Sequence, residues 1–415
     1  MRYSLLEHLA CPACHASLAC LTHTESAISM PEGLFPDGTR VAVGAGVGPA
    51  PAWKKPTPLT ALIDRLSTRP APPERGRQME VQTGLLICGE CGRWFPIEGG
   101  IPELLPDHLR DANRETALFS AAIASAPGEL RAALAAFTPS GDSASDPGAH
   151  YKKAEIGIKS KIDDPHFFGP GYSSPFNPWN SEFTVYLISL FGAVMPMLNA
   201  KRGDVIVDSG CGYSWSTEWL FRSGFDPIGV DICRTYLEIA IARIGSFRPH
   251  LVVGDVENLP LAASTANAIL AYESFHHIPD RRRAMASYDR VLKDGGTVIL
   301  AEPGGAHESA KVSVEAMEKY GILERGMELD DVAGYAAGTA FGDLGQVYVI
   351  RASQDELGRE IDPGFFKRHS AFDGNLFRLS KGPKRSSRQG ERVAPPLRMS
   401  AARIVRGLKR RLNPF

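Results

Sequence analysis

Short apolar runs and longer amphipathic stretches alternate along the second half of the chain. The apolar runs are four to six residues long, which is the length of a buried strand, and helical patterns fill the intervals. The runs with strand character are 205–208, 227–231, 251–254, 268–272, 297–302 and 347–350. Because parallel strands need a helical crossover, this alternation predicts an α/β fold with a mostly parallel sheet.

The first part of the chain has a different pattern. Two apolar stretches, LLEHLACPACHASL and GLLICGECGRWFPIEGGIPELLPD, flank a segment that is rich in Pro, Gly and Ala. That composition predicts a flexible insertion over about residues 22–83, with one short helix at 59–66. Residues 107–137 are rich in Ala and Leu and predict helices, and 139–148 predict a linker. The pattern divides the chain into residues 1–106, 107–150, 151–380 and 381–415.

One apolar stretch raises the question of a membrane span. Residues 186–198 are mostly apolar, but Ser189, Gly192 and Pro196 interrupt them. A helix of that length rises only about 20 Å, which is less than the hydrocarbon core of a bilayer. The stretch therefore predicts a buried helix. The first ten residues carry charges and no long apolar run, so we expect no secretory signal and a cytoplasmic protein.

Charge is spread unevenly along the 415 residues, although the net charge is −1. Residues 1–110 carry 10 basic and 11 acidic side chains, residues 111–380 carry 25 and 35, and residues 381–415 carry 11 and 1. The body is therefore acidic and the tail strongly basic. Because phosphate backbones bind to basic surfaces, this distribution disfavours a nucleic-acid partner for the body.

A glycine-rich turn follows the first of the strand runs. In DVIVDSGCGYSWSTEWLFRSGFDPIGVDIC, Asp208 ends that run, and Gly210 and Gly212 permit a tight turn that brings the backbone close to a ligand. A helical pattern then begins near Ser216, and the free amides at a helix N-terminus favour an anionic group. Asp231 ends the next run, where a carboxylate can accept hydrogen bonds from both hydroxyls of a ribose.

These residues resemble the cofactor site of the class I S-adenosylmethionine-dependent methyltransferases. The loop lacks the complete GxGxxG motif of dinucleotide dehydrogenases, because Trp215 occupies the position of the third glycine of that motif. VVGDVENLPL matches the third strand of the methyltransferase family, and VLKDGGTVILAEP matches its last turn and fifth strand. The resemblance covers residues 201–303 and implies a Rossmann-like domain that binds S-adenosylmethionine. The chain departs from the family at Ser214, where many members have glycine, but a small side chain still fits.

The resemblance also implies which residues bind the cofactor. Asp231 is expected to hold the ribose, and Asp255 is expected to bond the adenine amine. Glu273 and Glu302 each end a strand pattern, and either could hold the cofactor, hold a helix end or act as a base. The cofactor-binding set that we predict is Asp208, Gly210, Gly212, Ser214, Asp231, Ile232, Asp255, Val256 and Glu273.

Methyl transfer to a hydroxyl also requires removal of a proton, whereas the sulfonium already supplies a good leaving group. A histidine can accept a proton near neutral pH, and YESFHHIPD places His276 and His277 after the fourth strand pattern. Acceptor-facing residues usually lie there in this family, so the pair is the predicted catalytic group. The alternative is that one or both pack beneath the cofactor or cap the next helix. No Asn/Asp-Pro-Pro-aromatic motif follows that strand, which argues against the methylation of nucleic-acid base amines.

Four of the seven cysteines form two CxxC pairs, Cys11 with Cys14 and Cys88 with Cys91. Four thiolates at these spacings suit a closed, structural zinc site. The 73 residues between the pairs are compatible with this, because loop-closure entropy grows slowly with length. The alternative is two independent redox sites. Unpaired cysteines also suit a reducing compartment.

The residues around the cysteines resemble the small zinc-ribbon activators of tRNA and protein methyltransferases. The family pattern YPI-x-x-GIP-x-LL occurs here as FPI at 95–97 and GIPELL at 100–105. The activator is normally a separate chain that covers apolar surface on its enzyme. A fused ribbon therefore implies a stabilising role within the chain, with zinc bound for structure and not for chemistry.

Three interpretations of the function remain open. One is O-methylation of a small molecule or glycan, with the aromatic segment 166–179 as part of an acceptor lid or of the core. Another is methylation of rRNA or tRNA with the ribbon as a recognition module, which the charge distribution disfavours. The third is a non-catalytic cofactor-binding or scaffold protein. The basic tail is expected to be solvated, or to contact anionic lipid or an acidic partner.

Overall fold

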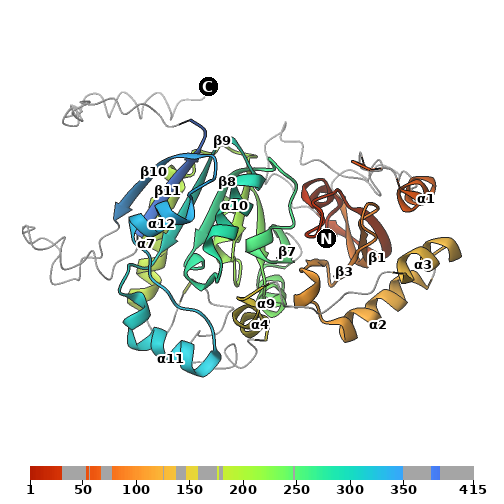
Figure 1. The fold of residues 1–415 in the computed structure, drawn as a ribbon, viewed down its shortest axis with the longest axis horizontal. Helices are drawn as coiled ribbons and strands as arrows, with labels where there is room; N and C mark the ends of the chain where they lie inside the picture. Colours follow the sequence, from red (N-terminus) through yellow and green to blue (C-terminus); the bar gives the residue numbers. More distant parts are fainter. Residues whose placement is uncertain are drawn as a thin grey trace, which may run out of the picture. The chain divides into compact units, whose positions relative to one another are not determined.

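The computed structural model describes most of the chain between Met1 and Pro383 (Figure 1). The described residues are 1–29, 53–55, 57–66, 77–124, 126–136, 146–157, 175–176, 181–245, 248–348 and 375–383. They belong to one compact unit, Met1–Pro383. Most of the acceptor lid predicted at 166–179 and the whole tail beyond residue 383 lie outside them.

Seven strands form the sheet that the alternating pattern predicted. Their order is β7-β6-β5-β8-β9-β11-β10, and all neighbouring pairs from β7 to β9 are parallel. The strands are β5 (Val205–Ser209), β6 (Asp226–Asp231), β7 (His250–Gly254), β8 (Ala266–Tyr272), β9 (Leu292–Glu302), β10 (Phe341–Tyr348) and β11 (Asn375–Lys381). The prediction of an α/β, mostly parallel fold is confirmed.

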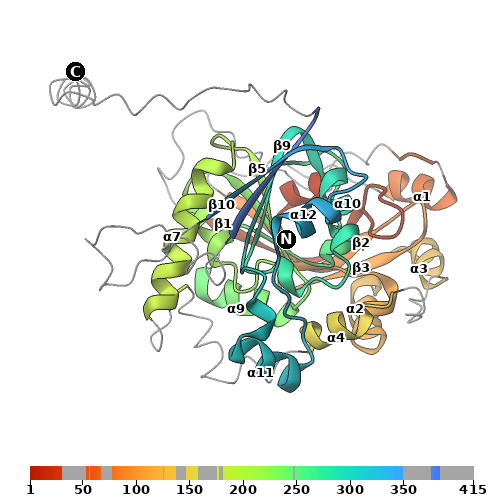
Figure 2. The same cartoon turned by 60° about the vertical axis from the view of Figure 1, so that its left-hand side comes forward.

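Alternate residues of each central strand face opposite layers, as the two-residue period of a strand requires. Ile206 and Leu270 pack against α7 (Ser181–Met197), whereas Val207 and Ile269 pack on the side of α10 (Arg281–Val291). Figure 2 shows α7 on one side of the sheet and α10 and α12 (Leu329–Tyr335) on the other. The remaining helices of this region are α8 (Trp215–Arg222), α9 (Arg234–Ile244) and α11 (Lys311–Tyr320).

The apolar stretch at 186–198 lies in α7, and Leu190 and Val194 are fully buried there, as the pattern predicted. Among the described residues, no helix is long and apolar enough to cross a membrane. One side of the 17-residue α7 is buried because its apolar side chains cover one face of the sheet, whereas Phe183 and Val185 are exposed.

The last two strands differ from the prediction. The run at 347–350 was expected to form a strand, but β10 begins earlier, at Phe341, and the described part ends at Tyr348. Strand β11 was not predicted, and Lys381, which we assigned to the basic tail, is its last residue. Because β11 pairs antiparallel with both β9 and β10, its conformation depends on two ladders that its own short sequence does not reveal.

The N-terminal region is an antiparallel sheet with helices on one side. It contains β1 (Ala19–Ser29), β2 (Arg77–Ile87), β3 (Trp94–Glu98) and β4 (Ile101–Leu104), which pair in that order. Leu85 and Ile87 of β2 face a small core that they share with three helices. These helices are α1 (Pro58–Leu66), α2 (Ala112–Ile123) and α3 (Gly128–Ala135).

Both ends of the expected insertion at 22–83 are strand, so that prediction is wrong there. β1 continues to Ser29 and β2 begins at Arg77, and the two strands pair from Ala19 opposite Ile87 to Ser29 opposite Arg77, with an irregularity around Thr24. The pairing explains the result, because each polar strand satisfies the backbone groups of the other. The short helix predicted at 59–66 is present as α1.

A single parallel pairing joins the two regions. Glu103 and Leu104 of β4 lie opposite Val253 and Gly254 of β7, so one eleven-stranded sheet runs from β1 to β10. The largest buried cluster spans the junction and includes Leu5, Phe95 and Leu259. The N-terminal region therefore covers the edge of β7, which would otherwise expose unpaired backbone groups.

Candidate functional site

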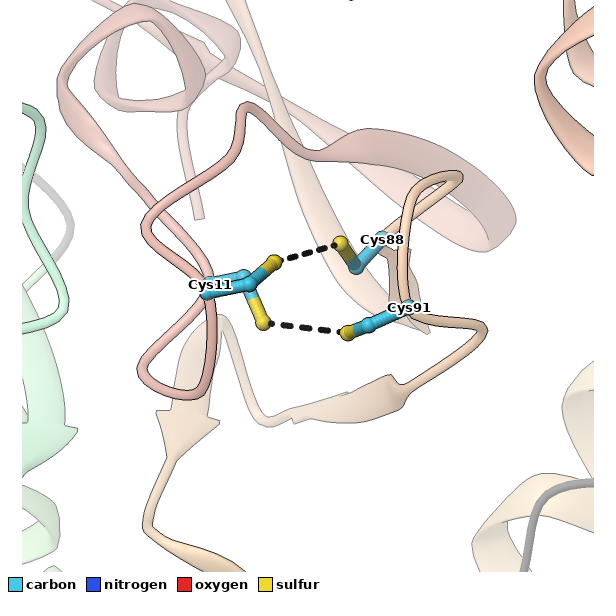
Figure 3. A group of neighbouring side chains, drawn as sticks. Cys11, Cys88 and Cys91 are labelled. Carbon is cyan, nitrogen blue, oxygen red and sulfur yellow. Dashed lines mark hydrogen bonds between the residues drawn. The ribbon is translucent and has the colours of Figure 1, made fainter. Parts of the chain in front are cut away.

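The two cysteine pairs meet between the N-terminal loop and the β2–β3 turn. Figure 3 shows Cys11, Cys88 and Cys91 pointing toward one another. The Sγ atoms of Cys11 and Cys91 are 3.6 Å apart, and those of Cys14 and Cys88 are 3.5 Å apart. Because the contacts join sulfur atoms of different pairs, the arrangement argues against two independent redox sites.

The four cysteines fit a zinc ion. Their sulfur atoms all lie within 4.8 Å of one another, and all four cysteines are free of disulfides. Four sulfur atoms at about 2.3 Å from a tetrahedral zinc ion are about 3.8 Å apart, which is close to the observed spacing. All four positions are thiols, so the site is closed and of the structural kind.

Local turns present the thiols of the second pair. The amide of Gly92 donates to the Cys88 carbonyl at 2.9 Å, and the amide of Cys88 donates to the Arg93 carbonyl at 2.8 Å. Gly92 has a φ of +77°, in the left-handed region that glycine adopts without strain. The turn therefore depends on Gly92 as much as on the cysteines.

The first cysteine loop touches the loop after β7. The Asn258 side chain donates to the Pro12 carbonyl, and its Oδ1 lies 2.9 Å from Nε2 of His15. The amide of Ala10 donates to the Pro260 carbonyl at 3.0 Å. These contacts link the cysteine centre to the segment that begins at Asp255.

A cavity of about 420 Å³ lies at the carboxyl ends of the parallel strands. It is lined by loops that follow β5, β6, β7 and β8, which is where open α/β sheets bind their ligands. Seven of the nine residues predicted to bind the cofactor line this cavity. They are Gly210, Gly212, Asp231, Ile232, Asp255, Val256 and Glu273.

The glycine turn after β5 is tightly constrained. Gly210 has a φ of +72°, and a Cβ at this position would lie 2.6 Å from Cβ of Ser274. The Ser274 hydroxyl donates to the Ser209 carbonyl at 2.7 Å, so the turn after β8 holds the turn after β5 in place. A side chain at Gly210 would therefore separate the two turns that form the floor of the cavity.

Asp231 is held at the wall of the cavity by two backbone donors. Its carboxylate accepts hydrogen bonds from the amides of Gly212 at 2.7 Å and Cys233 at 2.8 Å. Burial raises the pKa of Asp231 to about 6, and the two amide bonds oppose that rise. Because each carboxylate oxygen can accept a further bond, the side chain can receive the hydroxyls of a ribose.

Asp255 lies in a buried ion cluster that the sequence did not reveal. Nζ of Lys152 lies 2.9 Å from Asp255, 2.6 Å from Glu257 and 2.9 Å from Asp146. Burial lowers the pKa of Lys152, but the three carboxylates more than offset this, and the net shift is upward. Asp146 falls within the segment predicted as a linker at 139–148, yet it is buried and also contacts Nε2 of His108 at 2.9 Å.

Two predicted cofactor residues do not line the cavity. Asp208 is fully buried and accepts hydrogen bonds from the hydroxyls of Ser216 at 2.7 Å and Thr217 at 2.6 Å. It therefore holds the first turn of α8. Ser214 precedes that helix with a φ of +58°, a left-handed conformation that glycine adopts more easily. Both residues shape the turn and lie behind its cavity face.

The histidine pair also lines this cavity. Nδ1 of His276 lies 2.7 Å from Oε2 of Glu302. Glu302 is fully buried and also accepts hydrogen bonds from the amides of Ser274, Phe275 and His276. Of the roles left open for Glu302, the structure thus shows that it holds the short helix η5 (Phe275–His277).

A second carboxylate joins the histidines from a distant part of the chain. Oε2 of Glu324 lies 3.4 Å from Nε2 of His276 and 2.8 Å from Nε2 of His307. Nδ1 of His277 lies 2.7 Å from the Leu323 carbonyl. The imidazoles oppose burial and lower the pKa of Glu324 to about 2, so this carboxyl group is ionised.

Glu273, which follows β8, also lines the cavity. Its Oε1 accepts a hydrogen bond from the Tyr186 hydroxyl at 2.7 Å. Burial, followed by the charge of Glu302, raises the pKa of Glu273 to about 7. Its φ of +49° is unusual for a residue with a side chain and indicates local strain at the end of β8.

Sequence reasoning missed the cavity residues that come from outside the parallel strands. Lys152 comes from α4 (Ala149–Ile156), and His307 and Glu324 come from loops that follow β9. No local motif marks these positions. The distance of more than 100 residues between Lys152 and Asp255 hides the cluster from any pattern of spacing.

Comparison with known proteins decides the family. The methyltransferase domain family matches residues 207–300, and the Trm112p-like protein family matches residues 2–100. A putative methyltransferase of Encephalitozoon cuniculi is 32% identical over 158 residues, which cover 36% of this chain and 70% of that protein. The chain belongs to the methyltransferase family. Both resemblances seen in the sequence are thereby confirmed.

Other relatives match a smaller share of their own length. The methyltransferase is 30% identical to methyltransferase GfsG of Streptomyces halstedii over 145 residues, which cover 34% of this chain. The chain spans 52% of the length of that relative. A complex between the Trm112 methyltransferase activator of Haloferax volcanii and a putative methyltransferase aligns with 18% identity and a TM-score of 0.40, covering 50% of this chain and 93% of that one.

Proposed function

We propose that the chain transfers the methyl group of S-adenosylmethionine to an oxygen atom of a small molecule or glycan. One observation carries the proposal: a single cavity is lined by the glycine turn, Asp231 and Asp255 and also by His276 and His277. A cavity of about 420 Å³ lies within the usual range for small-molecule sites.

The cofactor half of the cavity would hold the nucleoside. Asp231 would accept bonds from the ribose hydroxyls, since its carboxylate is already oriented by Gly212 and Cys233. Asp255 would face the adenine amine, with Lys152 keeping its carboxylate in place. S-adenosylmethionine supplies a methyl group on a positively charged sulfur, which is a good leaving group once the acceptor is aligned.

The charge of the cavity supports a neutral acceptor over a polyanion. Lys152 is the only Lys or Arg side chain among the lining residues that the structure describes, and it is surrounded by carboxylates. The acidic side chains at the wall are Glu155, Asp231, Asp255, Glu257, Glu273 and Glu324. A phosphate backbone would be repelled by such a surface, which weighs against RNA as the acceptor.

The acceptor half of the cavity would assist loss of the hydroxyl proton. His276 is fixed by Glu302, and His277 is fixed by the Leu323 carbonyl, so both rings have a defined orientation. Apolar side chains of Phe176, Phe183 and Val312 also line the cavity and are exposed. The acceptor is therefore expected to combine an apolar body with a hydroxyl group.

Two measurements test the proposal. Calorimetric titration with S-adenosylmethionine should show binding, and absence of binding by the folded wild type would overturn the assignment. Transfer of labelled methyl groups should then be screened against extract fractions divided into RNA, protein, lipid and glycan. Label that appears only in the RNA fraction would contradict the proposed acceptor class.

The histidine pair gives a more specific prediction. We expect His276→Ala and His277→Ala each to lower turnover at least about tenfold, which is at the low end for loss of acid–base assistance. The variants should bind S-adenosylmethionine as the wild type does, because neither side chain is among the residues expected to hold the ribose or the adenine. Turnover equal to wild type in both variants would show that the histidines are structural.

A further inference from the structure

The acceptor end of the cavity contains a cluster of nitrogen and oxygen ligands. His276 belongs to η5, His307 begins η6 (His307–Ser309), and Glu324 lies in the loop before α12. All three side chains line the cavity, as does His277. His276 and Glu324 are less than 10% exposed, whereas His277 and His307 are partly exposed, so the cluster borders the space where an acceptor would bind.

The ligand atoms lie close together, although the shortest separation is a hydrogen-bond distance and would lengthen slightly around a shared metal ion. Oε2 of Glu324 lies 2.8 Å from Nε2 of His307 and 3.4 Å from Nε2 of His276. Ligand atoms at about 2.1 Å from one ion lie about 3.0 Å apart at right angles and about 3.4 Å apart in a tetrahedron. One ligand atom each of His276, His277 and Glu324 also lies within 4.8 Å of the other two.

The surroundings of the imidazoles are those of metal ligands. Nδ1 of His276 contacts the Glu302 carboxylate, and Nδ1 of His277 contacts the Leu323 carbonyl, both at 2.7 Å. Histidines that bind a metal usually donate their other ring N–H to a carboxylate or carbonyl, which fixes the ring orientation and increases ligand basicity. In His276 this leaves Nε2 as the ring atom nearest Glu324.

Charge also favours a cation in the cluster. Glu302 and Glu324 bring two carboxylates to three imidazoles in a buried space. A divalent ion bound to neutral imidazoles would balance both carboxylates. Imidazole and carboxylate together suit Zn²⁺, Mn²⁺ or Fe²⁺ better than Ca²⁺ or Mg²⁺, which prefer oxygen ligands alone.

We propose that His276, His307 and Glu324, with His277 beside them, bind a divalent transition-metal ion in the acceptor half of the cavity. This site is separate from the cysteine centre in ligands and in position. Binding of the ion at this site does not depend on the proposed function, whereas the role of the ion in methyl transfer does. With both ring nitrogens of His276 engaged, His277 is the base: a hydroxyl bound to the ion has a lowered pKa and can release its proton to the His277 ring. The oxygen then forms the O–CH₃ bond as the S–CH₃ bond breaks, which yields a methyl ether, S-adenosylhomocysteine and a proton.

The test counts metal ions in the full chain. Protein equilibrated with Zn²⁺ and then desalted should contain about two equivalents by mass spectrometry of the metal, one at the cysteines and one in the cavity. Glu324→Gln and His307→Ala should each keep the cysteine-bound ion and weaken binding of the second at least about tenfold. Glu308→Gln is the matched control, because it removes an exposed carboxylate beside His307 and should keep both ions.

A cobalt titration identifies the ligands of the second ion. Co²⁺ added to protein whose cysteines already hold zinc should give a visible spectrum without the strong sulfur-to-metal band of a thiolate site. The proposal would be overturned if the wild type bound only one equivalent of metal, or if both folded variants kept the second equivalent. Either result would mean that the cluster consists of ion pairs alone. Thermal melting of each variant shows that it is folded.

The role of the ion is tested separately. Methyl transfer should fall at least about tenfold when the second ion is removed with the first retained, and should return when Zn²⁺ or Mn²⁺ is added. If methyl transfer did not change, the ion would have no role in catalysis, but the proposal that it binds at this site would still stand. Failure to bind S-adenosylmethionine would instead reject the proposed function, and the metal count would be unaffected.

Discussion

Asp231 connects the glycine turn to the loop after β6. It accepts one amide bond from each side, from Gly212 and from Cys233, and so it fixes the position of both loops before any ligand binds. Burial nevertheless raises the pKa of Asp231 to about 6. The protonation of this residue therefore changes within an accessible pH range.

We expect binding of S-adenosylmethionine to weaken as the pH falls below 6. The ionised form of Asp231 accepts the ribose hydroxyls, and with a pKa of about 6 it is mostly protonated at pH 5. Linkage then predicts affinity about tenfold lower at pH 5 than at pH 7. Titration calorimetry across this range measures the change.

Asp231→Asn is the control for this pH dependence. It should bind at least about tenfold more weakly at neutral pH, and its remaining affinity should change little between pH 5 and pH 7. A slope equal to that of the wild type would assign the effect to another group, of which Asp208 is the first candidate, because burial raises its pKa to about 6 as well.

At the scale of elements, α4 lines the cavity although it lies well before the first strand of the parallel sheet. Its Lys152 makes ion pairs with carboxylates from the loop after β7 and with Asp146. The short helix is therefore attached to the sheet through charge, and the loop that includes Asp255 depends on it.

Lys152→Met should destabilise the protein strongly. Removal of one partner from a buried ion cluster typically costs about 3–5 kcal/mol, because the remaining charges are left without compensation. Lys152 is only 3% exposed, whereas its neighbour Lys153 is exposed, so Lys153→Met is a matched control that should change stability little. Chemical denaturation of both variants tests this, and equal stabilities would contradict it.

At the scale of the whole molecule, the zinc ribbon and the methyltransferase domain share one sheet and one core. β4 pairs with β7, and the first cysteine loop contacts Asn258 just after Asp255. Loss of the metal would therefore affect the cofactor loop as well as the ribbon.

Removal of zinc from the cysteines should lower the melting temperature by at least about 10 °C, because structural zinc contributes on the order of 10 kcal/mol to folding. Ribbon and domain are expected to unfold in one transition, which calorimetry can resolve. Restoration of zinc should recover the original melting temperature. Freshly purified protein without zinc, or a melting temperature that chelation leaves unchanged, would contradict a structural metal.

Much of this molecule followed from local sequence. The strand runs, the glycine turn and the two CxxC pairs are short-range patterns, because buried strands need apolar runs, tight turns need glycine, and a metal site needs thiols at close spacing. These patterns predicted the parallel sheet, the methyltransferase family and the cysteine centre. They also placed His276 and His277 after β8, at the edge of the cavity.

Only the tertiary structure decided which distant residues complete the site. Lys152 meets Asp255, and Glu324 meets His276, because separate segments fold onto the same sheet edge. The polar β1–β2 hairpin and the strand β11 likewise form only because a partner strand satisfies their backbone groups. Such pairings join segments that are far apart in the sequence, so the spacing of residues within any one segment does not predict them.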